Sequence, residues 1–371
     1  MRKIRVLIVD DSTVIRRLLS DALAVDPAIE IAGIAANGKI ALSKIPQINP
    51  DVITLDMEMP EMDGLTTLVE IRKLYPKLPV IMFSTLTQRG AESTFDALAL
   101  GANDYVTKPA NVGSVNAAIQ SVQSELLPKI KQFCGCATSL NSNARRTSTA
   151  VNHVSGLPLL SAPVVSKPSR VDIVVIGTST GGPNALSTIL PRIPAHFAVP
   201  ILIVQHMPPI FTRHLADRLN QQSNIDIREA ADGDLVGPGG AWLAPGNFHM
   251  KLRRQGTQFK VVLNQDIPEN SCRPAVDVLF RSAAEHFGPN VLSVVLTGMG
   301  QDGQRGCAAI RQVGGRVLVQ DEATSVVWGM PGSVANAGYA NQVVSLANIA
   351  DEIILQTQLG RTVRSLEKVG S

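Results

Sequence analysis

The feature that most constrains the fold is an alternation of short, β-branched apolar runs with segments of helical length. In the N-terminal part, the expected strands are Arg5–Val9, Ile29–Ala35, Val52–Leu55, Val80–Phe83 and Asp104–Val106. Helical periods fill the gaps between these runs, as at Thr13–Val25 and Gly64–Leu74. Continuous apolar strands separated by helices are typical of a parallel sheet covered on both faces. We therefore predict a doubly wound α/β domain.

The same alternation returns in the C-terminal part of the chain. There the clearest expected strands are Ile173–Ile176, Pro200–Val204, Val291–Leu296 and Arg316–Val319. Residues 241–263 differ, because glycine-rich turns separate short strands there, which favours an antiparallel meander. The second part is thus predicted to be a doubly wound, mostly parallel α/β domain with a small antiparallel meander.

The segment between the two parts has another composition. Residues 139–149 show no apolar period, and three prolines follow with Ser and Lys between them. Such a stretch buries too little apolar surface to offset the entropy of ordering it. We predict a first domain at 1–125, a flexible basic linker at 126–170 and a second domain at 171–365, with a helix from about Val112 to Phe133 completing the first. For 371 residues, two domains agree with the usual size of roughly 100–200 residues each.

The net charge of +3 is unevenly divided. Residues 1–125 carry −3, residues 126–170 carry +6, and residues 171–371 are neutral. Neither domain therefore has the basic surface typical of nucleic-acid binding. Aromatic residues, at 4%, are too few for a platform that stacks single-stranded bases. We expect no nucleic-acid partner.

The cysteines and the apolar runs indicate the compartment. The chain has four cysteines and only one C-x-C pair, Cys134 and Cys136, which predicts neither a zinc site nor a disulfide framework. No apolar run approaches the roughly 18 residues of a membrane span. The N-terminal apolar run is short and is followed directly by the acidic residues Asp10 and Asp11, which is not the pattern of a signal peptide. We expect a cytoplasmic protein that does not insert into the membrane.

Chemically active side chains follow successive strands of the first domain. Asp10 and Asp11 follow the first strand, Asp56 the third, Ser84 the fourth and Lys108 the fifth. Because the carboxyl ends of parallel strands meet at one edge, these groups should share a basin. Carboxylates suit Mg²⁺, which binds phosphoryl oxygens, and Lys108 would neutralise an added phosphoryl group. Any one of them could be a solubilising loop charge, but five at successive expected places favour a site.

The first domain, over about residues 4–122, resembles the receiver domain of bacterial response regulators. The similarity rests on Val9–Ser12, Leu55–Gly64 and the Lys108-Pro109 pair. It implies the flavodoxin-like strand order and a histidine kinase as phosphodonor.

The same resemblance implies roles for individual residues of this sequence. Asp56 would accept the phosphoryl group. Asp10, Asp11, Asp56 and the backbone carbonyl of Glu58 would hold Mg²⁺. Ser84 and Tyr105 would form, with Lys108, the switch that reorients after phosphorylation.

A G-x-S-x-G pattern marks the second domain. The strand ending at Ile176 runs into Gly-Thr-Ser-Thr-Gly-Gly-Pro at 177–183, followed by a helical stretch. Small neighbours permit the sharp turn that exposes the hydroxyl of Ser179, and Pro183 suits the first helical turn. The positive end of the helix dipole would favour anionic charge near Ser179. An ordinary glycine-rich turn, or one that binds phosphate, is the alternative.

A serine nucleophile needs a base, and the base needs an orienting acid. His206 follows the next expected strand and is the best candidate, with His249 on the meander as runner-up. Asp302 lies in a glycine-rich loop after the strand Val291–Leu296 and is the candidate acid, although it could simply cap a turn. The remaining histidines are expected in the linker or on the surface: His153, His196, His214 and His286.

The order of these residues along the chain is informative. Ser179, His206, Asp302 differs from the order Ser, acid, His of α/β-hydrolases. A dinucleotide site is disfavoured as well, because Ser179 stands where its fingerprint needs Gly and no acid ends the second strand.

The second domain, over about residues 171–365, resembles the catalytic domain of the chemotaxis protein-glutamate methylesterases, the CheB family. The matching motifs lie at 177–183, 205–207, 243–246, 273–280 and 296–303. The resemblance implies a glutamate γ-methyl ester on cytoplasmic chemoreceptor helices as substrate, with glutamine deamidation as a second activity. It also implies that the unphosphorylated receiver packs over the catalytic entrance.

In that reaction Ser179 would attack the ester, His206 would transfer the proton, and Asp302 would hold the imidazole. Backbone N–H groups at the elbow, including Thr180, and at Met299 are the candidate oxyanion donors. The esterase reaction requires no metal, so Mg²⁺ is expected only in the receiver.

Two rival functions are separable from this one. A DNA-binding output domain would be compact, helical and basic, whereas this second domain is about 200 residues long with no net charge. A phosphate- or cofactor-binding module would use Ser179 only to line a pocket, and would keep its function in Ser179→Ala.

Overall fold

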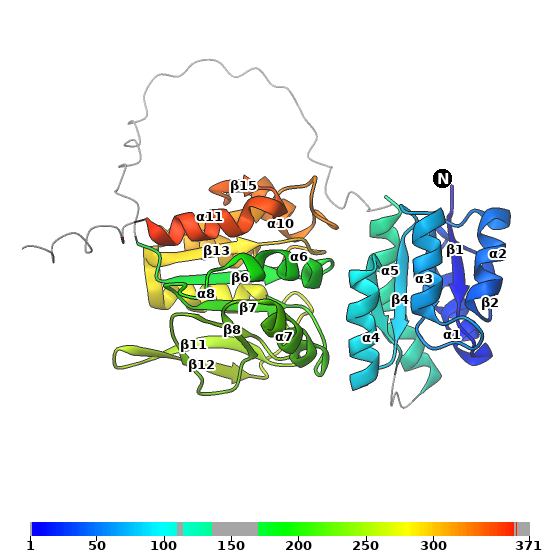
Figure 1. Ribbon diagram of the computed structural model, residues 1–371, viewed down its shortest axis with the longest axis horizontal. Helices are drawn as coiled ribbons and strands as arrows, with labels where there is room; N and C mark the ends of the chain where they lie inside the picture. The colour runs from blue at the N-terminus through cyan, green and yellow to red at the C-terminus, as the bar shows by residue number, and fades with distance from the viewer. Residues whose placement is uncertain (1, 110–113, 136–169, 360, 362–371) are drawn as a thin grey trace, which may run out of the picture.

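The computed structural model describes residues 2–109, 114–135, 170–359 and 361 (Figure 1). Its N-terminal sheet is wholly parallel, with the strand order β2-β1-β3-β4-β5. The strands are β1 (Ile4–Val9), β2 (Ile29–Ala35), β3 (Val52–Asp56), β4 (Val80–Ser84) and β5 (Asp104–Thr107). This order confirms the predicted flavodoxin-like topology.

Helices cover both faces of this sheet. They are α1 (Thr13–Ala24), α2 (Gly38–Ile48), α3 (Gly64–Leu74), α4 (Gln88–Ala99) and α5 (Val115–Phe133). Helices α1 and α5 pack on one face, and α2, α3 and α4 on the other. Each begins at a side chain that accepts a hydrogen bond from the first turn, which satisfies an otherwise unpaired N–H: Ser12, Asn37, Asp63, Thr87 and Ser114.

Helix α5 extends beyond the boundary predicted at residue 125. Leu126 and Ile130 are fully buried in the core beneath α1, so the helix belongs to the first domain as far as Phe133. The linker therefore cannot begin at 126, because this apolar stripe at helical spacing is used in packing. Residues 136–169, which hold most of the predicted linker, lie outside the described part of the chain.

The C-terminal sheet has seven parallel strands in the order β15-β14-β13-β6-β7-β10-β8. They are β6 (Ile173–Thr178), β7 (Ile201–Gln205), β8 (Asp226–Glu229), β10 (Gly240–Leu243), β13 (Val291–Val295), β14 (Arg316–Gln320) and β15 (Gln342–Val344). Strands β13, β6 and β7 are neighbours at its centre. This arrangement aligns the loops that follow β13, β6 and β7 at one edge of the sheet.

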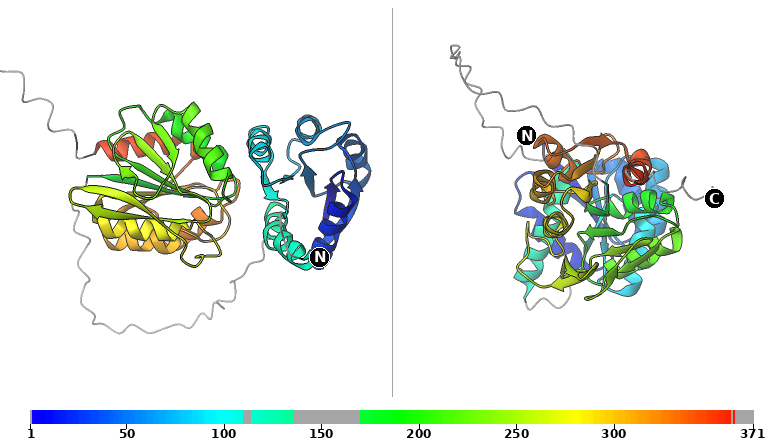
Figure 2. Two further views of the ribbon diagram at one scale, coloured as in Figure 1. Left: turned by 90° about the horizontal axis from the view of Figure 1, so that it is seen from below. Right: turned by 90° about the vertical axis from the view of Figure 1, so that its left-hand side faces the viewer.

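Helices again cover both faces (Figure 2). One face carries α6 (Gly182–Ile189), α7 (Phe211–Gln222) and α11 (Leu346–Gln358), with the 3-10 helix η1 (Leu190–Arg192). The other carries α8 (Val276–Phe287), α9 (Gln304–Gln312) and α10 (Met330–Asn336), with the 3-10 helix η2 (Gly288–Asn290) after α8.

A separate antiparallel sheet contains β11 (His249–Gln255), β12 (Gln258–Asn264) and β9 (Leu235–Val236). The prediction of a meander over 241–263 was therefore right for its second half and wrong for its start. Residues 240–243 form β10, which lies between β7 and β8 in the parallel sheet. Its Ala-Trp-Leu run is buried, and burial in the main sheet overrode the local turn signals.

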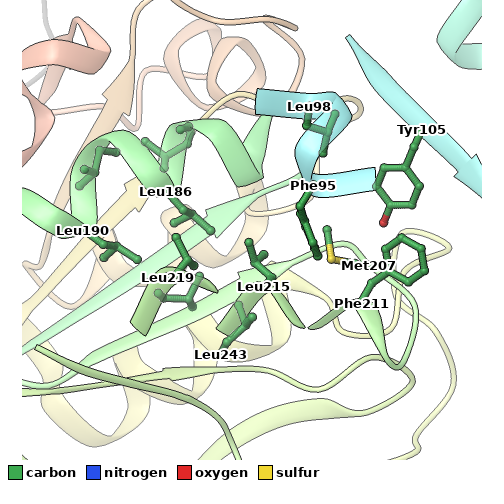
Figure 3. Close-up of a cluster of buried hydrophobic side chains, with 14 of the residues drawn as sticks. Phe95, Leu98, Tyr105, Leu186, Leu190, Met207, Phe211, Leu215, Leu219 and Leu243 are labelled. Carbon is green, nitrogen blue, oxygen red and sulfur yellow. The ribbon is translucent and has the colours of Figure 1, made fainter. Parts of the chain in front are cut away.

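The two domains share one continuous apolar cluster (Figure 3). Phe95 and Tyr105 from the first domain contact Phe211 at the start of α7, and Tyr105 stacks on it with ring centroids 5.0 Å apart. Near this cluster, Arg218 on α7 pairs with Asp96 on α4 at 2.7 Å. The end of the first domain bearing α4 and β5 is thus in contact with the second domain.

Candidate active site

The strand-to-helix turn after β6 positions Ser179. Gly181 begins α6 with φ +79°, a conformation that glycine adopts without strain. A Cβ at Gly298 would lie 2.8 Å from the Cβ of Ser179, so only glycine allows the loop after β13 to come this close. Pro183 stands in the first turn of α6, as predicted. Ser179 is half-buried at the carboxyl end of the sheet.

His206 and Asp302 lie on the two loops beside that turn. His206 follows β7, Asp302 lies in the loop between β13 and α9, and both strands neighbour β6. The imidazole Nε2 is 2.7 Å from Oδ2 of Asp302. In the described part of the chain, no hydrogen bond joins this imidazole to the hydroxyl of Ser179. Catalytic hydrogen bonds often tighten only when substrate is bound.

The carboxylate of Asp302 is buried and held by the start of α8. Its Oδ2 also accepts the N–H of Val276 at 2.7 Å, and its Oδ1 accepts the N–H of Asp277 at 3.0 Å. The Nδ2 of Asn270 donates to the same Oδ1 at 2.8 Å. Burial opposes ionisation, but His206 and the two N–H groups outweigh it and hold the pKa of Asp302 below its ordinary value. Asp302 therefore offers a fixed negative charge to His206.

A tight turn brings a thiol to the same imidazole. Glu269 and Cys272 exchange backbone hydrogen bonds of 3.1 and 2.9 Å, and the central residues Asn270 and Ser271 both have positive φ. Burial favours neutral His206, but Asp302 and then Cys272 favour its cation and raise the pKa of His206 to about 10. The resting site therefore favours the imidazolium.

The oxyanion candidates differ in what they already bind. The N–H of Ser179 itself donates to the carbonyl of Thr297 at 3.1 Å and is engaged. Thr180 and Met299 line the same cleft as Ser179. The hydroxyl of Thr180 donates to Asp104 of the first domain at 2.8 Å, a contact that sequence reasoning did not foresee.

His249 is not placed as a base. It is buried on β11, where its Nδ1 accepts the N–H of Ala275 at 3.2 Å and its Nε2 lies 3.1 Å from the carbonyl of Ile267. Both ring nitrogens are thus used in holding the antiparallel sheet to the loop before α8. The runner-up assignment therefore has no geometric support.

The remaining histidines only partly match the expectation of surface positions. His196 is exposed, whereas His214 and His286 are half-buried. His286 lies 2.9 Å from the carbonyl of Leu252, and His214 lies 4.0 Å from Glu92 of the first domain. Packing between elements distant in sequence covers both rings. His153 lies outside the described residues.

Ser179, His206 and Cys272 line a cleft of about 720 Å³ to which both domains contribute. Tyr105 and Lys129 form part of its wall from the first domain. Lys129 donates to Asp104 at 2.6 Å, so one carboxylate at the cleft joins a lysine of α5 to Thr180 beside the predicted nucleophile. The first domain therefore borders the predicted catalytic centre.

The carboxylate basin of the first domain has the predicted composition. Asp10, Asp11 and Asp56 each place a carboxylate oxygen within 4.8 Å of the others. Lys108 lies 2.8 Å from Asp56 and 3.0 Å from Asp10. Burial, supported by the charge of Asp10 and opposed by Lys108, raises the pKa of Asp56 to about 6.

The side chains of the other predicted residues of this domain are engaged outside that basin. The backbone of Glu58 hydrogen-bonds to Asp56, and its carboxylate is 3.8 Å from Arg89. The hydroxyl of Ser84 is turned toward α4, where it donates to the carbonyl of Gly90 at 3.1 Å. Tyr105 is buried against Phe211, and this burial raises the pKa of its phenol.

Sequence reasoning missed Cys272, Asn270 and Asp104. Asn270 and Cys272 belong to no strand end, and Asp104 begins a strand instead of ending one. The one available signal was the closeness of Cys272 to the motif at 273–280. In the described part of the chain, no helix has both the length and the apolarity needed to cross a bilayer.

Comparison with known proteins gives matches over both domains. Residues 6–120 match the response regulator receiver domain family, and residues 174–353 match the CheB methylesterase family.

Two curated relatives extend over nearly the whole chain. A protein-glutamate methylesterase/protein-glutamine glutaminase of Trichodesmium erythraeum is 55% identical over 95% of this chain and 99% of its own. One of Nocardioides sp. is 48% identical over all of both chains. The crystal structure of the Thermotoga maritima CheB methylesterase catalytic domain aligns with a TM-score of 0.49 and 43% identity, over 50% of this chain and 99% of that one.

Proposed function

The chain belongs to the CheB methylesterase family, and on that premise we propose that Ser179, His206 and Asp302 are its catalytic triad. The protein is a protein-glutamate methylesterase/protein-glutamine glutaminase regulated through a receiver domain. The observation that carries the residue assignment is the 2.7 Å hydrogen bond between His206 and Asp302, on the loops flanking that of Ser179.

The mechanism follows from the order of these groups. After His206 has lost its extra proton to solvent, the Oγ of Ser179 attacks the ester carbonyl while the neutral imidazole takes the serine proton and passes it to departing methanol. Since Nε2 faces Asp302, Nδ1 is the nitrogen left to receive that proton. Water then cleaves the acyl-enzyme with His206 again as base. The fixed charge of Asp302 orients the ring and stabilises the cation that forms.

The developing oxyanion needs donors that are free in the resting enzyme. The N–H of Ser179 is engaged by Thr297, so we assign this role to backbone N–H groups at Thr180 and Met299. One such donor is worth about 3–4 kcal/mol of transition-state stabilisation. With a glutamine side chain the same sequence of steps releases ammonia instead of methanol.

The basin of the first domain fits a bound Mg²⁺. Asp10, Asp11 and Asp56 bring carboxylates together, and the buried Oδ2 of Asp10 lacks a hydrogen-bond partner in the described structure although Lys108 lies 3.0 Å away. These carboxylates would hold the ion with the backbone carbonyl of Glu58. Bound Mg²⁺ neutralises and orients phosphoryl oxygens. Asp56 is the phosphoacceptor, and the ammonium of Lys108 is placed to pair with the added group.

The proposed control acts through the contact between domains. Tyr105, the predicted switch residue, stacks on Phe211, and Asp104 beside it accepts a hydrogen bond from Thr180. A phosphoryl group on Asp56 activates the enzyme if it draws Ser84 and Tyr105 toward the basin and so disfavours this contact. A tenfold activation requires only about 1.4 kcal/mol of difference between the two states.

The partners follow from these two chemistries. A chemotaxis histidine kinase supplies the phosphoryl group, and methylated cytoplasmic helices of chemoreceptors supply the ester. We place the protein in the cytoplasm, where both are accessible.

Methanol release from methylated receptor membranes tests the proposal. Wild type should release methanol, and faster with Mg²⁺ and a small phosphodonor. Ser179→Ala should release none while still accepting phosphate on Asp56. Equal release by Ser179→Ala would exclude the triad and favour a binding role for the turn.

A further inference from the structure

A thiol lies within the catalytic cluster, yet the esterase reaction gives it no step. His206, Cys272 and Asp302 each offer one ligand atom, and these atoms all lie within 4.8 Å of one another. We propose that this cluster is an inhibitory site for Zn²⁺, which would remove the catalytic imidazole from the reaction. Metal binding here is independent of the proposed function, whereas inhibition rests on it.

The ligand types select the metal. Thiolate, imidazole and carboxylate together are a donor set for zinc, whereas Mg²⁺ prefers oxygen alone. The two ligand sets lie at different sites of the chain, because the basin of Asp10, Asp11 and Asp56 offers only carboxylates. Zinc should thus prefer the catalytic cluster, and magnesium the receiver.

The distances between the three ligand atoms must change slightly before all three can bind one zinc ion. Ligands of one tetrahedral zinc, with bonds of about 2.0–2.3 Å, lie roughly 3.3–3.8 Å apart. The contact between His206 and Asp302, at 2.7 Å, must therefore open by about 0.6–1 Å, while atoms nearer to the 4.8 Å limit must close by about 1 Å. Rotation of the His206 and Cys272 side chains can supply movements of this size while Asp302 stays in place.

The surroundings hold the ligands in place. Asn270 and the N–H groups of Val276 and Asp277 fix the carboxylate of Asp302, and outer contacts of this kind orient metal ligands. The backbone pairing of Glu269 with Cys272 fixes the main chain that carries the thiol. The cleft of about 720 Å³ gives the ion an entry path and leaves its fourth position open to water.

Binding has a direct chemical consequence. As zinc binds, the thiol of Cys272 and the imidazolium of His206 each lose one proton to solvent, and the sulfur and Nε2 donate lone pairs to the metal. With Nε2 bound to zinc, the remaining ring proton lies on Nδ1, so the imidazole cannot take the proton of Ser179. Inhibition should be reversible on adding a chelator.

Cobalt provides a readout that does not depend on activity. Full-length protein carrying Cys134→Ser and Cys136→Ser, saturated with Mg²⁺ to fill the receiver, is titrated with Co²⁺. We expect a thiolate-to-cobalt absorption band that Zn²⁺ abolishes, and no band after adding Cys272→Ser or Cys272→Ala. A band that persists without Cys272, or none with it, would overturn the site.

Inhibition is then measured by methanol release, each variant being compared with its own zinc-free rate. Loss of even an outer contact weakens metal binding by about 10–100-fold, so loss of the thiol should raise the half-inhibiting zinc concentration by at least about 100-fold. Equal inhibition of Cys272→Ser and its parent would contradict the proposal.

A third measurement needs no substitution. In the wild-type protein, Zn²⁺ should slow alkylation of Cys272 by iodoacetamide, read by mass spectrometry, relative to the half-buried Cys134 as internal reference. Unchanged alkylation of Cys272 at saturating zinc would contradict the site even if the variants failed to fold. If zinc binds at Cys272 but does not inhibit, the metal site stands, whereas the inhibitory role and the assignment of His206 as base on which it rests are contradicted.

Discussion

The receiver basin and the hydrolase site occupy equivalent places in two different sheets. Both lie where loops leave the carboxyl ends of central parallel strands. In the basin, buried acids crowd one another, and burial raises the pKa of Asp56. In the hydrolase site the buried carboxylate of Asp302 receives five hydrogen bonds, and its pKa is lowered.

The two sites share their place in the sheet but differ in the groups that surround their carboxylates. In both domains the topology brings polar side chains together at the strand ends. The hydrogen-bond donors and cations around each carboxylate then determine its chemistry. Lys108 alone cannot neutralise Asp10 and Asp56, which leaves the basin ready for a cation. The N-terminus of α8 neutralises Asp302 in place, which leaves it suited to orient His206.

The largest expected effect is at the nucleophile. Ser179→Ala and His206→Ala should each lower turnover by about 10⁴–10⁶-fold, and the double variant should be little worse, because triad members act as a unit. Methanol release measures turnover, with phosphorylation of Asp56 as a control for folding. Losses that multiply in the double variant would show that the two residues act separately.

Asp302→Asn tests whether the orienting charge matters. It should lower turnover by about 10³–10⁴-fold, since an amide cannot hold the productive tautomer of His206. Circular dichroism must accompany the assay, because Asp302 also holds the start of α8. Activity within tenfold of wild type, with the fold intact, would remove Asp302 from the triad.

Asp56→Asn should abolish the response of the enzyme without changing its resting rate. Labelling from a small phosphodonor with Mg²⁺ should disappear, and methanol release should no longer rise when the donor is added. The exposed control Asp21→Asn should behave as wild type. Equal labelling of Asp56→Asn would mean that the acceptor lies elsewhere.

The contact between the two domains offers a smaller effect. Asp96→Arg should raise the unphosphorylated rate about two- to fivefold, because a partly exposed ion pair contributes about 0.5–1 kcal/mol. Adding Arg218→Asp should restore the resting rate by remaking the pair in reverse.

A pair within the second domain provides the matched control. Arg192 and Asp351 are 2.8 Å apart and similarly exposed, and reversing them should leave the response to the phosphodonor unchanged. If the Asp96 exchange also leaves the resting rate unchanged, restraint through this face is contradicted.

The smallest change concerns pH. The raised pKa of His206 means that imidazolium predominates up to a higher pH than for a free histidine, so the base is lost as pH falls. Initial rates in chelator-containing buffers should therefore rise with pH, with a midpoint above 6.5. Cys272→Ala should move this midpoint to lower pH, since one cause of the raised pKa is removed. A midpoint unaffected by Cys272 would separate the thiol from the imidazole.

The sequence by itself determined the parts that depend on short, local patterns. Alternating apolar runs identified nine strands of the two parallel sheets to within one or two residues. A polar residue after a strand singled out Asp56 and His206, and the G-x-S-x-G pattern singled out Ser179. These signals are local because a parallel sheet places strand ends at one edge whatever the loops contain. The family resemblance added roles to positions already singled out.

Only the tertiary structure decided which distant segments meet. Asn270 and Cys272 reach Asp302 and His206 through a turn whose residues follow no periodicity, and β10 joins the main sheet because its side chains are buried there. The bond from Thr180 to Asp104 joins residues in different domains. Such contacts depend on how whole helices and sheets pack against one another. No local sequence pattern marks the residues that meet in this way.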